Sequence, residues 1–397
     1  MKGPTPRRLW KYTAQCLGLR EYLQHPGDGR RRPQIPAAAL LWALLVARLL
    51  RQKAFRAVEA LVRSPARRAL GVSRAFGDDS LGYFTERLSA AWTRRALAQA
   101  LRRAKRNKAF DDSRFIGLAV DGTTVGRCRK QGCPFCRPFR NRAREVVGYR
   151  HHLAVISLVG TGLTLPLDVE PYAPGDSEYA ASQRLLRRAK RHLGRRFADY
   201  VVVDGEMATA PFLHAVGACG WRVVARLKDN LPELFQAAQR RFQAQPPRST
   251  FLAGEDRVEV WDVDDFDPWE TLRWETVRVL RYRQHKPHGE VVEAYWLTDF
   301  PATQVSSRTL YRLAKSRWEI ENQGFNDAKN RYGLEHLCRH EAHSLVIVWL
   351  LTLLALVIER LYRLRHLHRG THPAPAASAF CLQLWLSLSN PATLDSS

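Results

Sequence analysis

The sequence predicts an α/β protein in which a mixed sheet is flanked by helices, with a β-rich insertion and a helical N-terminal region. Two observations predict this class. From about Phe115 onward, short β-branched runs alternate with amphipathic helical segments, which is typical of an α/β core. In the residues before Phe115, apolar side chains recur every three to four positions instead, which is typical of helices. With 397 residues, 45% of them hydrophobic and 25% charged, the chain can bury a large core.

Changes in composition divide the chain into five predicted segments. A helical, basic region is followed by a core in two parts that a β-rich insertion separates. The last segment is rich in Pro, Ala and Ser and is predicted to be a flexible tail. The segments are residues 1–110 (helical and basic), 111–230 (first part of the core), 231–300 (insertion), 301–370 (second part of the core, with C-terminal helices) and 371–397 (tail).

The N-terminal region is strongly basic. Residues 1–110 contain 24 Lys and Arg against 6 Asp and Glu, a net charge of +18 out of +25 for the whole chain. Clustered cations release counterions from phosphates, so we expect double-stranded DNA as the partner. A GC-rich coding bias toward Arg, or a merely solvated face, is the alternative. A predicted helix after Asp79 would carry an arginine-rich face suited to the phosphate backbone. That face comprises Arg87, Arg94, Arg95, Arg102, Arg103 and Arg106.

Cysteine usage and apolar runs bear on the compartment. Seven cysteines, an odd number, and a basic N-terminus without an apolar leader favour a reducing cytosol, so a cytoplasmic protein is expected. The apolar runs 37–50 and 345–358 are shorter than the roughly 20 residues of a membrane span, so we predict two buried core helices and no membrane partner. Without a GxxxxGK phosphate loop, an ATP-driven mechanism has no support.

The core elements follow in order along the chain. "FIGLAVDGT" predicts a strand ending at Asp121, and "HHLAVISLV" with "TLPLDVEPY" predicts a hairpin around Gly160–Gly162. A helix, "SEYAASQRLLRRAKRHL", precedes a second strand, "VVVD", that ends at Asp204. After the insertion we predict one long helix that starts at Ser306 or Ser307 and ends near Gly333, and a last apolar helix over 344–366.

Two acids mark a candidate site. Asp121 and Asp204 each end a predicted strand and each precede a glycine. Ligands of open α/β sheets gather at the carboxyl ends of strands, so these carboxylates are expected to meet. Their repulsion favours a cation between them, and Mg²⁺, a hard ion with oxygen ligands, fits. Two Mg²⁺ ions supporting an in-line phosphoryl displacement would need a third acid.

The late helix offers that acid. Arg317, Glu321, Phe325 and Lys329 are successive i+4 positions of "RWEIENQGFNDAK" and would share one side of a helix. Alternatively, the charged residues on this side of the helix form solvent-exposed i,i+4 ion pairs. Ile320, Phe325 and Leu334 would anchor the helix to the core, and Glu319 would face solvent. Glu178, at the start of the helix after Asp176, is a helix-capping acid or an acid beside the site.

A cysteine cluster follows the first acid. Cys128, Cys133 and Cys136, with His151, form a set suited to a tetrahedral Cys₃His zinc site; free thiols in a basic loop are the alternative. Neither His151 nor His152 is favoured as a catalytic base. A bound metal ion lowers the pKa of its water molecule, so two-metal chemistry does not need a histidine base.

Taken together, Asp121-Gly-Thr, Asp204-Gly and "RWEIEN..F...K" resemble the DDE transposases of bacterial insertion sequences, in the group with a Y-R-E-K signature and a β-rich insertion. The resemblance covers roughly residues 115–340 and extends to "LDVEPYAPGDSE", "VVVDGEMATAPFL" and "VVARLKDNLPELF". It implies an RNase H-like fold for the core. It also implies a metal-binding triad of Asp121, Asp204 and Glu321.

Other roles are likewise implied by the resemblance. Arg317 and Lys329 would hold DNA phosphates, and Trp318 would stack on a flipped base, although a core tryptophan is the alternative. A Cys-rich knuckle before a "Y.H" stretch, here Tyr149 and His151, also occurs in the resembling subset. Two departures affect the signature: its Tyr falls on Ala314, with Tyr311 a turn earlier, and Lys329 is one position farther from Glu321 than usual.

The function expected from the resemblance is that of a transposase which cuts and joins the ends of its element with Mg²⁺ (or Mn²⁺). Two element ends imply a homodimer on DNA. A metal-dependent nuclease without strand transfer shares every residue discussed and is the first alternative. A catalytically inactive DNA-binding remnant is the second, although such a protein would not need all three acids.

Overall fold

A ten-stranded mixed sheet runs through the protein, which is described by a computed structural model over residues 3–368 and 374–389. Nine strands follow the order β2-β3-β1-β5-β6-β10-β9-β8-β7, and β4 pairs with β3. The strands of the core are β1 (Gly117–Cys128), β2 (Arg137–Arg140), β3 (Val146–Val159), β4 (Leu165–Pro171), β5 (Tyr200–Val203) and β6 (Arg222–Leu227).

The centre of the sheet has the order β4-β3-β1-β5-β6 and confirms the predicted mixed sheet. β1, β3 and β4 are antiparallel neighbours, whereas β5 and β6 run parallel to β1. All four residues of β5 are buried, because helices cover both faces of a parallel strand. The hairpin between β3 and β4 turns at Gly160 (φ 77°) and Gly162 (φ 70°), as predicted; both take the left-handed backbone conformation that glycine tolerates.

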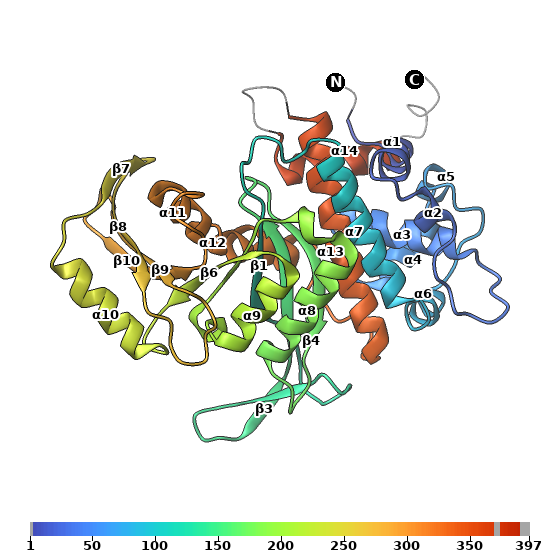
Figure 1. The fold of residues 1–397 in the computed structure, drawn as a ribbon. Coiled ribbons are helices and arrows are strands. Elements are labelled where there is room, and N and C mark those ends of the chain that lie inside the picture. Colours follow the sequence, from blue (N-terminus) through green and yellow to red (C-terminus); the bar gives the residue numbers. More distant parts are fainter. Residues whose placement is uncertain (1–2, 369–373, 390–397) are drawn as a thin grey trace.

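Helices on the two faces of the sheet position the site. α8 (Glu178–Leu193) packs on β1, β3 and β4, and α9 (Ala210–Cys219) packs on β6. Figure 1 shows both in front of the core strands, with the later helices α11 and α12 behind. Side chains alternate along a strand, so consecutive residues of β1 face these two helical layers in turn.

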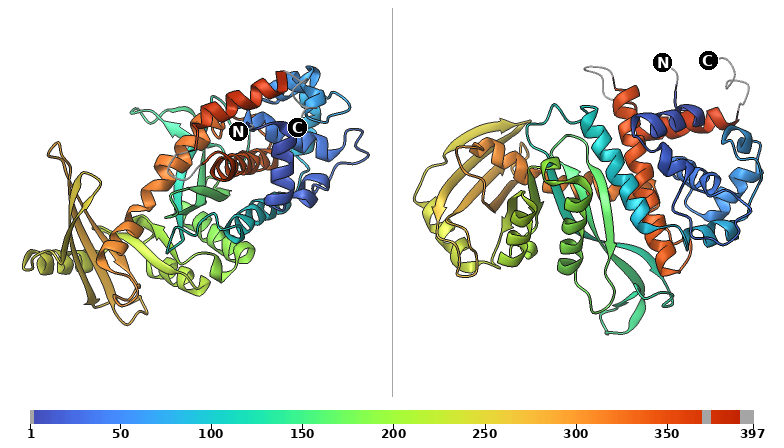
Figure 2. Two further views of the ribbon diagram at one scale, coloured as in Figure 1. Left: turned by 90° about the horizontal axis from the view of Figure 1, so that it is seen from above. Right: turned by 45° about the vertical axis from the view of Figure 1, so that its right-hand side comes forward.

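The insertion prolongs the core sheet. It consists of α10 (Pro232–Gln243), β7 (Ser249–Ala253), β8 (Asp256–Phe266), β9 (Val277–His285) and β10 (Val291–Thr298). β10 pairs antiparallel with β6, with Trp296 opposite Arg226. α10 packs Phe235 and Phe242 on Tyr295 of one face, while Tyr311 of α11 packs on Tyr282 of the other. Figure 2 shows the insertion and the N-terminal helices at opposite ends of the molecule.

The N-terminal region is helical, as the apolar spacing predicts. Its helices wrap around α13 (Ala342–His366), which packs against α3, α7 and β4. α13 is long and apolar enough for a membrane span, yet 94% of its most apolar window is buried inside the protein, which fits the predicted core helix. The helices are α1 (Pro6–Lys11), the π-helix η1 (Tyr12–Cys16), α2 (Arg20–Gln24), α3 (Ala37–Leu49), α4 (Phe55–Arg63), α5 (Ala66–Ala69), α6 (Asp78–Thr85) and α7 (Ala90–Arg106).

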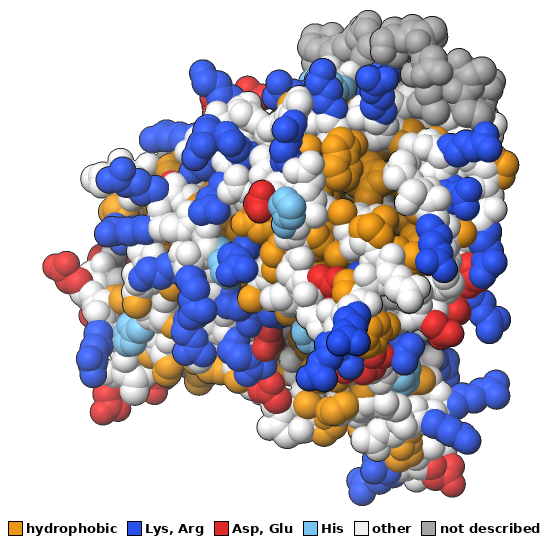
Figure 3. All heavy atoms as spheres, turned by 90° about the vertical axis from the view of Figure 1, so that its right-hand side faces the viewer, with side chains coloured by type: hydrophobic (Ala, Val, Ile, Leu, Met, Phe, Trp, Pro, Cys, Tyr) orange, Lys and Arg blue, Asp and Glu red, His pale blue; other side chains and the backbone are white. Residues whose placement is uncertain are grey.

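The predicted arginine-rich helix differs from the structure in two ways. It is broken between α6 and α7, where Ser89 caps α7 by accepting a hydrogen bond from the Trp92 amide. Its arginine face is also not entirely free, because α7 lies on β4 and Arg94 donates to Asp168 at 2.9 Å. Arg87, Arg95, Arg102 and Arg106 remain exposed. Figure 3 shows cationic side chains spread around an apolar area on this side of the molecule.

The late helical segment begins and ends as predicted but is not a single α-helix. The Ser306 hydroxyl accepts a hydrogen bond from the Thr309 amide at the start, and Gly333 (φ 71°) follows the end. Between them lie α11 (Ser307–Lys315), α12 (Arg317–Glu319) and two wide π-helical segments, η4 (Ile320–Phe325) and η5 (Asp327–Arg331). Within η4 the Asn326 amide donates to the Glu321 carbonyl, five residues back.

The prediction of a flexible tail is wrong for most of the residues described there. α14 (Ala377–Ser389) is an apolar helix whose Phe380 and Leu384 are fully buried, and it packs on α1 and α5. Composition misled the prediction because Pro, Ala and Ser surround a stretch with helical spacing of apolar residues. The other predicted tail residues, apart from 374–376, lie outside the described residues.

Candidate active site and a cysteine–histidine cluster

Asp121 lies inside β1 rather than at its end, which corrects the prediction. The strand continues to Cys128 because β3 pairs with it throughout, with Asp121 opposite Val155. On the other side, the parallel pairing with β5 stops at Ala119 opposite Val202. Continued by two residues, that register sets Asp121 beside Asp204, at the edge where β5 ends. Both aspartates therefore lie at the edge of the sheet where β5 ends.

Asp204 follows β5 directly and begins the short 3₁₀ turn η3 (Gly205–Met207). Lys228, which follows β6, donates to its Oδ2 at 3.0 Å. Although burial raises the pKa of Asp204, this hydrogen bond and that of the Gly205 amide hold it below its usual value. Asp204 is therefore an ionised carboxylate, half-exposed at the sheet edge.

Arg317 joins two of the predicted acids. Its Nη1 donates to Oδ2 of Asp121 at 3.0 Å, and its Nη2 donates to Oε1 of Glu321 at 2.6 Å. Arg317 is 9% exposed, and it also lies close enough to Asp204 for that charge to raise its pKa. The i+4 relationship between Arg317 and Glu321 holds as predicted, and it brings Glu321 to the aspartates.

Burial and neighbouring acids perturb Asp121. Burial raises its pKa to about 7, the Glu321 and Glu178 carboxylates add to that rise, and Arg317 opposes it. Within the described chain, no set of three oxygens from these acids lies within 4.8 Å of one another. A guanidinium between Asp121 and Glu321 accounts for the spacing, since it is itself a cation held by both carboxylates.

Glu178 is a fourth acid at this site. It is the first residue of α8, and its Oε2 accepts a hydrogen bond from the Tyr172 hydroxyl at 3.2 Å. Gly122 leaves the room it needs, because a Cβ there would lie 1.9 Å from Oε2 of Glu178. Burial raises the pKa of Glu178, and the charges of Glu206 and Asp204 add to the rise. These contacts place Glu178 beside the site, as one of its two predicted roles requires. The other role, capping of α8, is filled by the preceding Ser177.

The other signature residues form no hydrogen bond or ion pair with the three acids among the described residues. Trp318 is half-buried and packs edge-on against Trp296, with Lys315 over its ring at 4.8 Å. Lys329 is half-buried, and its Nζ lies 3.8 Å from Glu335. Tyr311 is buried against Tyr282 and donates to Gln284. The π-helical segments change the helix phase after Ile320, so Lys329 does not follow the stripe that an α-helix would make.

The prediction that Glu319 faces solvent is wrong. Its Oε2 accepts a hydrogen bond from the Gly160 amide at 3.0 Å, in the turn between β3 and β4. The helical segment lies across the sheet, so its side away from Glu321 faces this turn and not water. The predicted anchors Ile320, Phe325 and Leu334 are buried as expected.

Two other acids near the core have structural partners. Asp168 and Glu170 of β4 form ion pairs with Arg94 of α7 and Arg188 of α8. Two arginines from two helices thus neutralise two carboxylates on one strand. This network ties the N-terminal region to the sheet and leaves these acids engaged away from Asp121.

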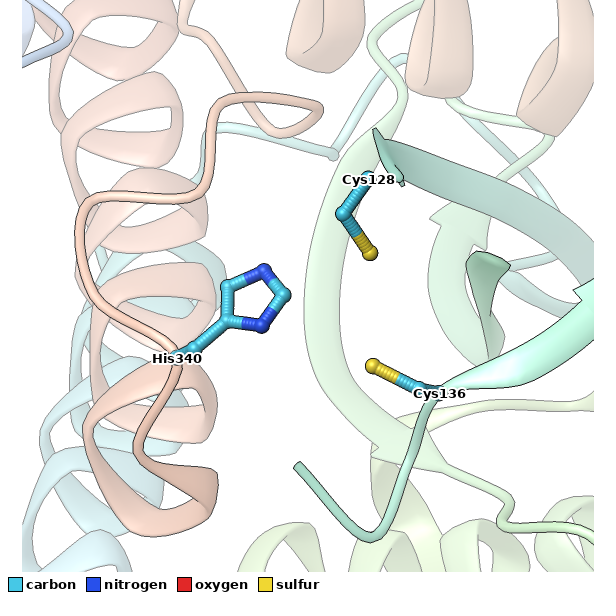
Figure 4. Close-up of side chains that lie close together, drawn as sticks. All are labelled: Cys128, Cys136 and His340. Atoms are coloured by element: carbon cyan, nitrogen blue, oxygen red, sulfur yellow. The ribbon is translucent and has the colours of Figure 1, made fainter. Parts of the chain in front are cut away.

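A cysteine–histidine cluster lies at the far end of β1. Cys133, Cys136 and His151 are buried together, with His151 Nε2 at 3.2 Å from the Cys133 sulfur and 3.6 Å from that of Cys136. Cys128 belongs to a second group, with Cys136 and His340, whose ligand atoms lie within 4.8 Å of one another. Figure 4 shows the His340 ring pointing between the sulfurs of Cys128 and Cys136.

The sequence analysis did not single out three residues that contribute to these sites: His340, Lys228 and Arg360. His340 is 189 positions after His151, so no local spacing connects it with the cysteines. Lys228 follows a strand as Asp204 does, and strand-end position could have found it. Arg360 of α13 supports η4 and η5 by donating to the Gln323 carbonyl at 2.7 Å and to Asp327 at 2.6 Å, a contact that an apolar-helix pattern does not reveal.

Comparisons with known proteins show which family the chain matches. Residues 112–358 match the family described as Transposase DDE domain. No curated protein matches the chain. Among solved structures, the chain is similar to a piggyBac transposase in a synaptic complex with hairpin DNA, with 11% identity, a TM-score of 0.46 and coverage of 99% of this chain and 82% of that one.

The family match includes all three predicted acids and the insertion between the second and the third. The mixed sheet with its flanking helices is the RNase H-like fold expected for the core. Because the match spans well over half of its residues, the chain belongs to the family of transposase DDE domains.

Proposed function

We propose that the protein is a transposase of a bacterial insertion sequence which cuts and joins DNA ends by divalent-metal-dependent phosphoryl transfer. The observation that carries the proposal is the bridge made by Arg317, which contacts Asp121 at 3.0 Å and Glu321 at 2.6 Å. Residues 196 positions apart are brought within the span of one guanidinium group. Such convergence is not needed for DNA binding alone.

Asp121, Asp204 and Glu321 are the proposed ligands of Mg²⁺ or Mn²⁺. Their carboxylate oxygens are the hard donors that these ions prefer, and all three side chains are at least partly accessible. When bound, two such ions activate the attacking oxygen and stabilise the departing 3′ oxygen. Glu178 is the proposed fourth acid. Its carboxylate fills the space beside Gly122, next to Asp121 in the chain, and accepts a hydrogen bond from the Tyr172 hydroxyl. We propose that it helps to position Asp121.

Arg317 has a second proposed task. Its guanidinium can bind two oxygens at once, of a carboxylate or of a phosphate. With these acids engaged as metal ligands, the Arg317 guanidinium would be available to the DNA phosphate next to the reacting bond. Lys329 is proposed to hold a phosphate farther along the strand, since its amine lies 3.8 Å from Glu335 and makes no closer ion pair within the described residues. Trp318 is proposed as a stacking surface because its ring is only half-buried.

Two basic surfaces are proposed to bind double-stranded DNA. The first comprises the exposed cations of the N-terminal helices. The second is the basic hairpin, residues 127–150, which includes β2 and the outer half of β3 and projects from the core (Figure 1). This segment has eight Lys and Arg and one acid, Glu145. A homodimer assembled on two element ends would place two such hairpins on DNA.

A joining assay tests the function. A donor plasmid carrying the DNA that flanks the coding region is incubated with the purified protein, Mg²⁺ and a target plasmid. We expect excised donor and joined target product, both absent with EDTA. Cleavage without any joined product would identify a metal-dependent nuclease instead. Binding without cleavage in Mg²⁺ or Mn²⁺ would identify a DNA-binding remnant.

A further inference from the structure

Five metal-ligating side chains converge at the base of the basic hairpin. They come from four places in the chain: Cys128 ends β1, Cys133 and Cys136 lie in the loop before β2, and His151 lies in β3. The fifth, His340, belongs to the loop between η5 and α13. The two groups that these residues form share Cys136.

The buried group already has the dimensions of a zinc site. In a tetrahedral site, two sulfurs lie about 3.8 Å apart, and a sulfur lies about 3.6 Å from a nitrogen. Here the sulfurs of Cys133 and Cys136 are 3.7 Å apart, and His151 Nε2 is 3.2 and 3.6 Å from them. The Gly132 amide donates to the Cys136 sulfur at 3.5 Å, which would stabilise a thiolate. Three of four corners are thus in place.

The burial of His151 also supports a metal site. The residue is 0% exposed, and its Nδ1 makes no hydrogen bond within the described chain. Its Nε2 lies between two thiol sulfurs, which are weak hydrogen-bond partners for a buried ring nitrogen. A metal ion bound by both sulfurs and by Nε2 would replace these weak contacts with metal bonds. The structure therefore favours a metal-binding His151 over a purely packed one.

The fourth corner has two candidates, Cys128 and His340. Cys128 is fixed by the pairing of β1 with β3, and its sulfur lies 3.7 Å from the Tyr149 carbonyl of the partner strand. His340 lies outside helices and strands, so a small movement of its loop can bring the ring closer. A Cβ at residue 132 would lie 1.9 Å from Nδ1 of His340, so Gly132 leaves the space in which this ring packs on the cysteine loop.

We propose that one Zn²⁺ is bound by Cys133, Cys136, His151 and His340, and that it fastens the basic hairpin to the loop before α13. The hairpin continues β1, which carries Asp121, while the loop continues the segment that carries Glu321. A single ion would thus limit the movement of the two acid-bearing segments relative to each other. This role is structural and does not depend on the proposed DNA chemistry.

Metal content tests the ligand set directly. The purified full chain should contain about one zinc per molecule after dialysis. Cys136→Ser and His340→Ala should each lose at least nine-tenths of it, whereas Cys128→Ser should retain it. Loss of zinc in Cys128→Ser with retention in His340→Ala would overturn the assignment of His340. Absence of zinc from a wild-type protein refolded or expressed with zinc would overturn the site itself.

Spectroscopy and rescue keep the test independent of folding defects. Replacement of zinc by Co²⁺ should give absorption typical of tetrahedral coordination by two thiolates and two imidazoles. His340→Cys should recover zinc binding and change the spectrum to that of three thiolates, because cysteine is also a zinc ligand. An unchanged Co²⁺ spectrum in that variant, or zinc loss although circular dichroism shows a native fold, would contradict ligation at position 340.

Discussion

Arg317 lies between Asp121 and Glu321, 3.0 Å from one carboxylate and 2.6 Å from the other. Its positive charge offsets the repulsion between acids that the fold brings together, which is also what divalent ions bound at the proposed site would do. Arg317 begins α12, and the wide turn of η4 follows that helix from Ile320.

Replacement of Arg317 tests this relationship. Arg317→Ala should lower the free energy of unfolding by on the order of 1–3 kcal/mol in EDTA, because two partly buried carboxylates lose their partner. Mg²⁺ should restore more stability to this variant than to the wild type. Thermal unfolding with and without Mg²⁺ measures both effects. Equal stabilisation of the two proteins by Mg²⁺ would show that the ion does not bind to the carboxylates that Arg317 contacts.

Glu178 and Gly122 form a second testable pair. Glu178→Gln should reduce metal-dependent cleavage about 10- to 100-fold, as the loss of a group that orients metal ligands does. Gly122→Ala should have a similar effect, because a Cβ there would lie 1.9 Å from Oε2 of Glu178. Glu206→Gln, which changes an exposed acid next to Asp204, is the matched control and should keep most of the activity. Wild-type rates in Glu178→Gln would exclude a role for this acid.

Arg360 should be the main support of the π-helical segments. It is 6% exposed and donates to the Gln323 carbonyl, to Asp327 and to the Thr164 carbonyl. Arg360→Met should cost about 3 kcal/mol, since Asp327 loses its buried partner and keeps the more exposed Arg331. Chemical denaturation measures the loss, and Arg363→Met on the same helix should cost less. Similar losses in both variants would mean that Arg360 contributes no more than a surface arginine.

The basic hairpin should contribute to DNA affinity through charge. Arg142→Gln with Arg144→Gln should weaken binding to any duplex and should reduce the slope of log K against log salt by about 2, one phosphate contact for each arginine. Arg240→Gln with Arg273→Gln, two exposed arginines of the insertion, should leave the slope unchanged. Titrations at several salt concentrations decide the matter. An unchanged slope in the hairpin variant would remove this surface from the DNA interface.

Strand-level features were predictable because they depend on local pattern. The buried run of β5, the glycine turn at Gly160–Gly162 and the cap at Ser306 each follow from a few neighbouring residues, and the structure confirms them. The division of the chain into an N-terminal helical region, a core and an insertion rests on the same local signals.

Features set by tertiary packing were not predictable in this way. Periodicity of 3.6 residues cannot reveal that the turn after Glu319 is π-helical, and the position of Lys329 depends on that turn. Arg94 looked like part of a DNA-binding face, yet β4 supplies Asp168 as its partner. Glu319 looked solvent-facing only because the sequence does not show the turn that covers it.

The candidate site shows the same division. The identities of Asp121, Asp204 and Glu321 came from position and resemblance, whereas Glu178 could be placed only once Gly122 was seen to leave space for it. His340 is separated from the cysteines by more than 200 residues, and only the fold brings them together.

The central claim is that Asp121, Asp204 and Glu321 bind the same divalent ions and that these ions carry out DNA cleavage. Single-turnover cleavage of an element end in Mn²⁺, by the wild type and by Asp121→Asn, Asp204→Asn and Glu321→Gln, tests it most directly. Each variant should fold normally and lose at least about 1000-fold in rate, because every carboxylate is a proposed ligand of one shared metal centre. Cleavage at the wild-type rate by any one of the three would contradict the account.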